Sequence, residues 1–143
     1  MTTKTAVEEV IARQIAAWNR HDAAELAAGY TVDTTVLDPY YTEPLSGRDA
    51  VAKDAASFFV GFPDISFRIT KTLSSGNTAA YEGMASATHT GPLELPSGVV
   101  PATNKRLEFS FAGFIELDEA GKIREERRYY DVAGQLTQLG LMQ

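Results

Sequence analysis

The spacing of apolar residues changes once along this chain, and that change limits the folds it can adopt. Before Pro63 the apolar residues recur at three- and four-residue steps, as Val7, Val10 and Ile11 do in a first helix predicted over Thr5–Trp18. After Pro63 apolar and polar residues alternate, as they do in half-buried strands. Helices followed by long antiparallel strands predict an α+β fold and not a parallel, doubly wound sheet.

Turn and capping residues give the order of the remaining elements. A short helix over Ala23–Ala28 follows Asp22, whose side chain suits the capping position, and a third helix is predicted over Arg48–Phe59. A short strand in TTVLDP separates these two helices, and the turns SSGN and DEAG each lie inside a hairpin. The later elements are then a hairpin over residues 64–90, a long irregular loop over 91–105, a hairpin over 106–131 and a helix over Val132–Leu139.

We therefore expect residues 1–143 to form one α+β domain, in which a strongly curved antiparallel sheet packs against the N-terminal helices as a cone with one open mouth. A sheet of this kind tends to hold a pocket that is lined mostly by apolar residues. The loop over residues 91–105 carries three prolines and two glycines, a composition typical of a lid or a binding loop.

The composition argues against several classes of protein. A net charge of −6 disfavours a nucleic-acid surface, which needs clustered positive charge, and Glu125 and Glu126 interrupt the basic residues between Lys122 and Arg128. The chain has no cysteine, and no apolar run approaches the roughly 20 residues that span a bilayer. We expect a soluble, cytoplasmic protein that binds neither nucleic acid nor membrane.

Metal and phosphate sites are not indicated by the sequence. The two histidines, His21 and His89, are far apart, and no acidic cluster has the spacing of metal ligands. The glycines of SSGN, PSGV and EAGK are typical of turns, and neither a phosphate-binding loop nor a nucleophile elbow is present.

Asp131 stands where the last predicted strand gives way to the last helix, in the stretch YYDVAGQLTQLG. Its side chain could cap that helix, which is the interpretation that the residues alone favour. It could also point into the pocket as a general acid or base, with a pKa shifted by enclosure. Alternation does not decide which face of the strand looks inward, because neither face is cleanly apolar and a bulge would shift the count.

Four other residues qualify as candidates for a site. His89, in ATHTGP, precedes the long loop and suits proton transfer near neutral pH, although a structural role in the sheet is favoured by the residues alone. Asp38 and Tyr41 belong to DPYY at the end of the first strand, where they could turn the chain or line a pocket. Trp18 is expected in the core or at the inner wall of the pocket.

Several stretches, taken together, resemble the SnoaL-like polyketide cyclases of the nuclear-transport-factor-2-like superfamily. They are AAWNRHD, VLDP, GRDAV, THTGP, DEAGKI and YYDVAGQLTQLG, and the resemblance runs from about Val7 to Leu141. It implies a cone-shaped, cystatin-like α+β barrel that assembles as a homodimer or homotetramer through its sheet. It also implies ring closure by intramolecular aldol condensation without metal or cofactor, with the essential carboxylate at Asp131 and a histidine partner at His89.

Two departures from the family pattern bear on the pocket. The chain has PATNK at Pro101–Lys105 where the family often has PPTGK, and Arg127 where the family often has tryptophan. An arginine beside Asp131 would favour the ionised carboxylate and so a base. With Trp18, Asp38, Tyr41 and Tyr129, Arg127 completes the residues expected to bind a small apolar or aromatic molecule.

Three functions follow as hypotheses. The leading one is a lyase or isomerase in which Asp131 moves a proton next to a carbonyl and His89 donates to the developing oxyanion. The second is epoxide hydrolysis, as in limonene-epoxide-hydrolase-like relatives, with Arg127, Asp131 and Asp38 imitating an Asp–Arg–Asp set around a water. The third is a non-catalytic module that binds a small molecule.

Overall fold

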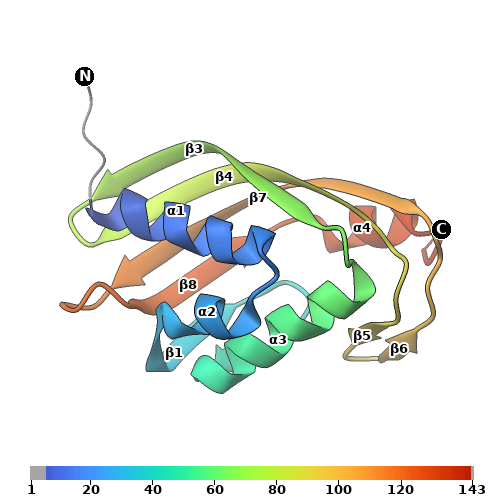
Figure 1. Ribbon diagram of the computed structural model, residues 1–143, viewed down its shortest axis with the longest axis horizontal. Helices are drawn as coiled ribbons and strands as arrows, with labels where there is room; N and C mark the ends of the chain where they lie inside the picture. Colours follow the sequence, from blue (N-terminus) through green and yellow to red (C-terminus); the bar gives the residue numbers. More distant parts are fainter. Residues whose placement is uncertain (1–5, 143) are drawn as a thin grey trace.

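The computed structural model describes residues 6–142 and shows a curved sheet with a layer of helices on one of its faces (Figure 1). Thr5, where the predicted first helix begins, lies outside the described residues. The elements are α1 (Ala6–Asn19), α2 (Ala23–Ala28), β1 (Tyr30–Leu37), β2 (Leu45–Ser46), α3 (Arg48–Gly61), β3 (Ser66–Ser75), β4 (Thr78–Thr88), β5 (Leu93–Leu95), β6 (Gly98–Val100), β7 (Arg106–Leu117), β8 (Ile123–Tyr129) and α4 (Val132–Gln138).

The helices form where the apolar spacing predicts them. Val7, Val10 and Ile11 of α1 are buried in the main core, together with residues of α2, α3 and the sheet. Asp22 accepts a hydrogen bond from the Glu25 amide at 3.0 Å, which confirms its predicted role as the cap of α2. No helix between residues 6 and 142 is long and apolar enough to cross a membrane.

Helix α3 is tied to the sheet at its beginning. Arg48 donates two hydrogen bonds to the Tyr30 carbonyl, at 3.0 and 2.6 Å, so the first turn of α3 is fixed against the start of β1. Val51 and Ala55, both fully buried, face the core from the next turns. The other side chains of α3 therefore have defined positions relative to the sheet.

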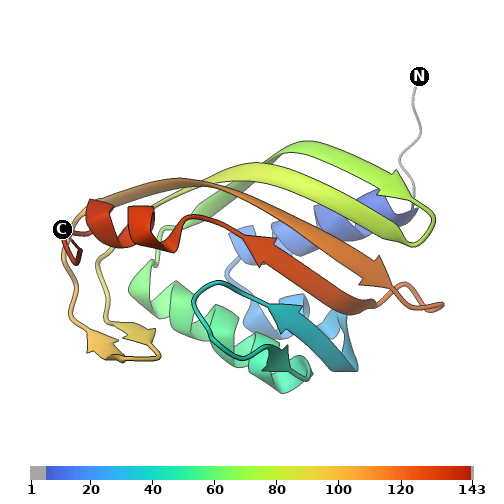
Figure 2. The ribbon, with the colours of Figure 1, turned by 180° about the vertical axis from the view of Figure 1, so that it is seen from behind.

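The main sheet has the strand order β2-β1-β8-β7-β4-β3. The two predicted hairpins, β3–β4 and β7–β8, are present and antiparallel. β1 pairs in parallel with β8, a pairing that the antiparallel prediction did not include. Figure 2 shows β1 and β8 side by side from behind, with α4 continuing from β8. The predicted α+β class and the packing of the sheet on the N-terminal helices are confirmed.

A β-bulge in β8 decides which of its side chains point inward. The pairing with β7 skips Arg124, so that Glu125 lies opposite Glu116 while Ile123 lies opposite Leu117. An extra residue of this kind reverses the alternation beyond it. After the bulge, Glu126, Arg128 and Tyr130 face the helices, whereas Glu125, Arg127 and Tyr129 lie on the outer face of the sheet.

The segment predicted as a long irregular loop contains a small hairpin instead. Strands β5 and β6 pair antiparallel, and the hairpin packs on the end of α3. Leu93 is buried there, and the Gly91 amide donates to the Gly61 carbonyl at 3.2 Å. Strands of three residues bounded by prolines leave too short an alternating pattern to be recognised in the sequence.

Candidate active site

A cavity opens between the helical layer and the inner face of the sheet. It holds roughly 1090 Å³ of empty space, part of it open to solvent at the mouth. Aromatic and aliphatic side chains together form most of its wall, and a small set of charged and amide side chains lies among them. The aromatic residues are Trp18, Tyr30, Tyr40, Tyr41, Phe58, Phe67, Tyr81, Phe109, Phe111 and Tyr130, and the polar set includes Asp38, Asp54, Glu126, Arg128 and Gln135.

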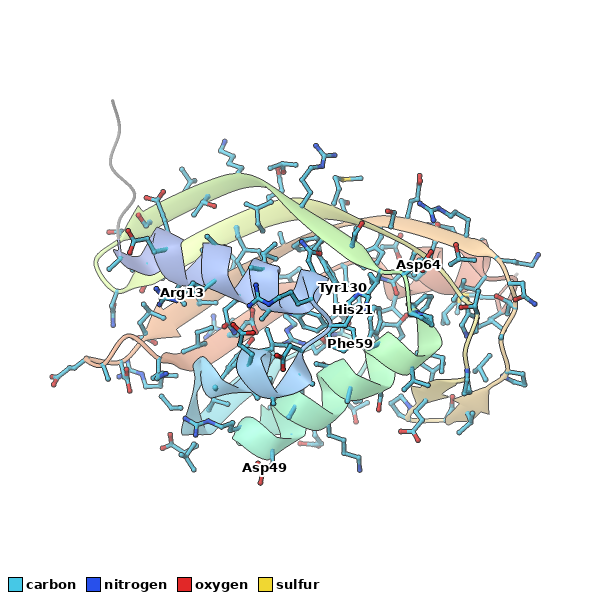
Figure 3. The ribbon with its side chains drawn as sticks, in the orientation of Figure 1. Arg13, His21, Asp49, Phe59, Asp64 and Tyr130 are labelled. Atoms are coloured by element: carbon cyan, nitrogen blue, oxygen red, sulfur yellow. The ribbon has the colours of Figure 1, made fainter. Side chains whose placement is uncertain are left out.

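The aromatic wall is packed ring against ring. The ring centroid of Trp18 lies 5.1 Å from that of Phe67 and 5.5 Å from that of Phe59. Phe59 also stacks on His21 at 4.8 Å, and Figure 3 shows these two rings and Tyr130 in the middle of the molecule, between helices and sheet. Rings that support one another in this way give the cavity a defined shape.

The guanidinium of Arg128 is the centre of the polar set. Its side chain is 11% exposed, and Nη1 donates to Asp38 Oδ2 and to Asp54 Oδ2, each at 3.1 Å. Nε donates to Glu126 Oε1, also at 3.1 Å. Burial by itself would lower the pKa of Arg128, but Glu126 and its other anionic neighbours raise that pKa well above its usual value. The cavity thus holds one fixed cation among three carboxyl groups.

Glu126 is held by donors on three sides. Besides Arg128, the hydroxyls of Tyr30 and Tyr81 donate to its two oxygens at 2.5 and 2.8 Å. Burial, and then the charge of Glu126, raise the pKa of both tyrosines, so both keep their protons and remain donors. Tyr81 reaches Glu126 because the residue between them is Gly113, where an added Cβ would lie 2.2 Å from the Tyr81 hydroxyl.

Asp38 is also held by three hydrogen-bond donors. The Tyr130 hydroxyl and the Tyr40 amide donate to its Oδ1, the latter at 2.9 Å, and Arg128 donates to its Oδ2. Hydrogen bonds between a guanidinium and a carboxyl group are among the stronger ones in proteins. Asp38 therefore serves as the anchor that orients Arg128 and Tyr130.

Asp54 has fewer partners than Asp38. One oxygen accepts from the Tyr41 hydroxyl at 2.7 Å and the other from Arg128 at 3.1 Å. Burial raises the pKa of Asp54, against the opposing effect of Arg128. Asp54 and Tyr41 also line a second hollow, whose wall includes residues of α3 and β5, and the side chain of Asp54 is 13% exposed. Of the three carboxyl groups, Asp54 is the one best placed to exchange a proton.

The sequence contained a signal for Asp54 that was not used in the prediction. One face of α3 is formed by residues at steps of three, one and three positions, which are Val51, Asp54, Ala55 and Phe58. A carboxylate in the apolar stripe of a helix is buried, and a buried carboxylate needs a partner. The position of Arg128 as that partner could not be read from the sequence, because it depends on the bulge at Arg124.

The structure brings three of the predicted binding residues to the cavity and leaves two outside it. Trp18, Asp38 and Tyr41 line the cavity. The expectation that Arg127 and Tyr129 face inward is corrected, because the bulge turns both to the outer face. Arg127 pairs there with Glu125 at 2.9 Å, and the exposed ring of Tyr129 lies 6.1 Å from that of Phe114.

The capping role that the residues alone favoured for Asp131 is confirmed, and the alternative, in which the side chain points into the pocket, is not what the structure shows. Asp131 is exposed and caps α4, accepting a hydrogen bond from the Gly134 amide at 2.9 Å. A side chain at Gly134 would lie 2.5 Å from the Asp131 carboxylate, so the glycine makes room for the cap. Asp131 is not part of the cavity wall. Its catalytic role, implied by the resemblance, stays a prediction without geometric support.

His89 lies in a second, smaller core and not at the cavity. Its Nδ1 is 2.9 Å from the Thr103 hydroxyl and accepts from the Thr103 amide at 3.2 Å, and its ring packs 5.2 Å from Phe62. Burial lowers the pKa of His89 and favours the neutral ring. Its role as the partner of a catalytic carboxylate likewise stays a prediction.

The segment Pro101–Lys105 is fastened by the backbone of His89. The His89 amide donates to the Lys105 carbonyl at 3.0 Å, and the Asn104 amide donates to the His89 carbonyl at 2.8 Å. Asn104 has a φ of 60°, in the left-handed region, where glycine is most favourable and asparagine is the best tolerated alternative. Asparagine at position 104 is therefore compatible with the backbone conformation of this segment.

Residues 6–142 contain no group of three or more histidine, aspartate or glutamate side chains arranged to hold a metal ion. Within the cavity, Arg128 already occupies the place between Asp38 and Asp54 where a cation would have to bind. The chemistry that this arrangement offers is proton transfer between a carboxyl group and a bound molecule.

A few charged and amide groups enclosed among mostly apolar side chains are typical of a site for a small molecule. A sequence profile of the SnoaL-like polyketide cyclases matches residues 8–139, and the chain belongs to that family, which confirms the resemblance predicted from its motifs. No curated protein sequence matches the chain.

Solved structures share the fold at low sequence identity. A protein from Jannaschia sp. CCS1, described as a candidate SnoaL-like polyketide cyclase, has a TM-score of 0.82 and 14% identity, with 97% of each chain covered. A protein from Catenulispora acidiphila DSM 44928 with a ketosteroid isomerase-like fold, solved with trimethylamine, has a TM-score of 0.76 and 20% identity over 93% of each chain. SalBIII, an epoxide hydrolase/cyclase-like enzyme of pyran ring formation in the polyether salinomycin, has a TM-score of 0.72 and 18% identity, covering 88% of this chain and 91% of that one.

Proposed function

We propose that the cavity is an acid/base site that acts on a small, mostly apolar or aromatic molecule, with Asp54 as the group that takes and returns the proton. The observation that carries this proposal is the contrast between Asp54 and its neighbours. Asp38 and Glu126 are each held by three donors, whereas Asp54 has two, lies at the cavity wall and has a raised pKa. A carboxyl group whose pKa moves toward the working pH is suited to general acid/base catalysis.

The reaction that suits these groups is an aldol-type ring closure or a related isomerisation. Ionised Asp54 takes a proton from a carbon next to a carbonyl group, and the electrons of that C–H bond form the enolate. The enolate carbon attacks a second carbonyl, a C–C bond forms, and the new alkoxide takes the proton back from Asp54. Asp38 and Glu126 hold Arg128 in place, and Arg128 stabilises the ionised form of Asp54 before the proton is taken and after it is returned.

A specific observation favours opening of an epoxide as the second candidate. Arg128 bridges Asp38 and Asp54, which is the Asp–Arg–Asp set that the sequence had suggested for Arg127, Asp131 and Asp38. In this reaction Asp38 would accept the proton of the attacking water or hydroxyl group, and protonated Asp54 would give its proton to the epoxide oxygen. The structural likeness to SalBIII supports keeping this alternative.

Proton abstraction can be tested without knowing the natural substrate. In D₂O, the rate at which the C2 hydrogens of 1-tetralone exchange is measured by NMR with catalytic amounts of protein. We expect the wild type to accelerate exchange and Asp54→Asn to lose on the order of 10²–10⁴-fold of that acceleration. Asp49→Asn is the matched control, because Asp49 is exposed on the same helix and points away from the molecule (Figure 3).

The proposal fails if Asp54→Asn exchanges the ketone as fast as the wild type, or if the wild type gives no exchange above background. The epoxide alternative has its own readout. Styrene oxide incubated in ¹⁸O-labelled water would yield a labelled diol with the wild type and not with Asp54→Asn or Asp38→Asn.

We further propose that the protein is a cytoplasmic homodimer or homotetramer. The outer face of the sheet exposes Leu73, Met84, Phe114 and Tyr129, which supports pairing through that face. The absence of cysteine supports a reducing compartment. Light scattering after size exclusion would test the assembly, since Phe114→Glu should convert it to a monomer.

A further inference from the structure

Gln135 of α4 is part of the cavity wall and has an unpaired hydrogen-bond donor. Its side chain is 1% exposed and lines the cavity wall. The Tyr40 hydroxyl donates to its Oε1, which fixes the orientation of the amide. Its Nε2 has no hydrogen-bond partner within residues 6–142, although it is shielded from solvent. A buried amide donor without an acceptor destabilises the folded protein, so such groups are rare unless something else binds them.

The other polar groups of the cavity differ from Gln135 in this respect. Arg128, Glu126, Asp38 and Asp54 are matched with one another and with tyrosine hydroxyls. The amide of Gln135 is matched only on its oxygen side. A methionine or leucine of similar volume would fill the same place without a polar cost. The donor is therefore best explained by an acceptor atom on the molecule that the cavity binds.

We propose that Gln135 donates through Nε2 to a neutral carbonyl oxygen of the bound molecule and so restricts the ligands to ketones, esters or quinones. This inference rests on the proposed function and names its substrate class. An anionic oxygen is disfavoured, because three carboxyl groups and one guanidinium already give the cavity an excess of negative charge. A hydrocarbon is disfavoured because it leaves the donor unpaired.

The position of Gln135 relative to the acid/base group follows from a chain of contacts. Tyr40, which holds the amide, packs its ring 5.6 Å from that of Tyr130, and Tyr130 donates to Asp38. Asp38 in turn binds the Arg128 nitrogen that also binds Asp54. The amide and the proton-transferring carboxyl group are thus fixed in one cavity by one connected set of side chains.

A donor in this place would do more than select the ligand. A hydrogen bond to a carbonyl oxygen withdraws electrons from the neighbouring C–H bond, and it strengthens as negative charge develops on that oxygen in the enolate. Gln135 would therefore bind the ketone and stabilise the state that follows proton removal by Asp54.

Ligand binding tests the inference independently of turnover. The affinities of 1-tetralone, of the hydrocarbon tetralin and of 1,2,3,4-tetrahydro-1-naphthoate are compared by the quenching of Trp18 fluorescence. We expect the wild type to bind the ketone roughly fivefold more tightly than the hydrocarbon, as one net hydrogen bond gives, and to bind the carboxylate least well. Gln135→Met should bind ketone and hydrocarbon equally.

Infrared spectroscopy of ¹³C=O-labelled 1-tetralone supplies a readout that a merely structural role would not change. We expect the carbonyl stretch to move to lower frequency on binding to the wild type, and not on binding to Gln135→Met. Gln138→Met is the matched control, because Gln138 lies on the same helix but binds the backbone of Glu108 on the outside. It should keep both the ketone preference and the frequency shift.

Equal affinities for ketone and hydrocarbon in the wild type, including failure of both to bind, would overturn the inference, as would an unshifted carbonyl band. These measurements need no folded variant. If Gln135→Met does not fold, Tyr40→Phe provides the second variant, because it frees the amide without removing it and should broaden the carbonyl band. If Asp54→Asn loses exchange but the wild type shows no preference for the ketone, only the inference about Gln135 is refuted. If the wild type prefers the ketone but Asp54→Asn still catalyses exchange, only the role of Asp54 is refuted.

Discussion

The two faces of β8 carry the same three residue types in the same order. Glu125, Arg127 and Tyr129 lie on the outer face, and Glu126, Arg128 and Tyr130 lie on the inner face. Outside, the 53% exposed Arg127 meets one carboxylate, on its own strand. Inside, the 11% exposed Arg128 meets three carboxyl groups, from the loop after β1, from α3 and from β8 itself. The same three residue types therefore belong to the cavity on one face of β8 and to ordinary solvent-exposed surface on the other.

Solvent explains the difference. An exposed ion pair competes with water and salt and contributes only about 0–1 kcal/mol to stability. Inside the cavity, water is largely replaced by aromatic rings, so each charge depends on its protein partners. The three inner residues, Glu126, Arg128 and Tyr130, are held in fixed positions for that reason. Each has a matched control on the outer face, where Glu125, Arg127 and Tyr129 lie.

The largest expected difference is between the two arginines. Arg128→Met leaves Asp38, Asp54 and Glu126 buried without their cation, so we expect it to lower the free energy of unfolding by about 3–5 kcal/mol. Arg127→Met removes one exposed pair and should cost no more than about 1 kcal/mol. Urea denaturation of both variants measures the difference, and similar costs would mean that the inner arginine is not the centre of a buried cluster.

The two glutamates should differ less. Glu126→Gln replaces one acceptor oxygen by an amide donor that faces Tyr30, Tyr81 and Arg128, so we expect a loss of about 2–3 kcal/mol. Glu125→Gln should change stability by about 0.5 kcal/mol or less. Thermal unfolding of the pair would settle the comparison, and a neutral Glu126→Gln would show that its tyrosine partners do not need a charged acceptor.

The tyrosine pair tests a single hydroxyl. Tyr130→Phe removes one donor to the Asp38 carboxylate, at a cost of about 1.5–2 kcal/mol, because hydrogen bonds to charged groups are stronger than neutral ones. Tyr129→Phe, at an exposed ring, should leave the unfolding midpoint in urea within error. Equal midpoints for the two variants would contradict the assignment of Tyr130 to the inner cluster.

The raised pKa of Asp54 predicts a dependence of stability on pH. A folded-state pKa above the ordinary value means that the folded protein binds this proton more readily than the unfolded chain. The resulting stabilisation is complete below the ordinary pKa of aspartate and is lost as the pH rises through the folded value. The stability of the wild type relative to Asp54→Asn should therefore fall as the pH rises above the ordinary pKa of aspartate. A relative stability that rises over this range would show that burial does not dominate at Asp54, and Asp49→Asn reports the effect of removing a surface carboxylate.

The smallest effect is expected outside the cavity, at Asp131. Asparagine caps helices about as well as aspartate, so Asp131→Asn should change the free energy of unfolding by about 0.5 kcal/mol or less. Exchange of the C2 hydrogens of 1-tetralone should be unchanged. Loss of that exchange would return the catalytic role to Asp131, as the family resemblance implied.

The sequence predicted the elements whose signals are local. The helical stripe of α1, the cap at Asp22 and the turns of the two long hairpins each depend on a few neighbouring residues, and all three are present. The parallel pairing of β1 with β8 and the short β5–β6 hairpin were missed, since one joins distant segments and the other is too short to alternate.

The candidate site was harder to predict for a reason that lies in β8 itself. Because EERRYY repeats each residue type, either register gives the strand a glutamate, an arginine and a tyrosine on each face. Only the bulge at Arg124 chooses between them, and that bulge is a property of the pairing with β7. The family motif then drew attention to Asp131 and His89, although the pattern of α3 already contained a carboxylate on its apolar face.

Gly113 has a consequence for anyone who wishes to redesign this protein. The gap that it leaves in β7 is filled by the phenol of Tyr81, and a methyl group there would also press on the Arg127 carbonyl at 2.8 Å. The aromatic rings at the mouth can be exchanged to admit other molecules. Gly113 has to be preserved, because a side chain there would displace the Tyr81 phenol that donates to Glu126.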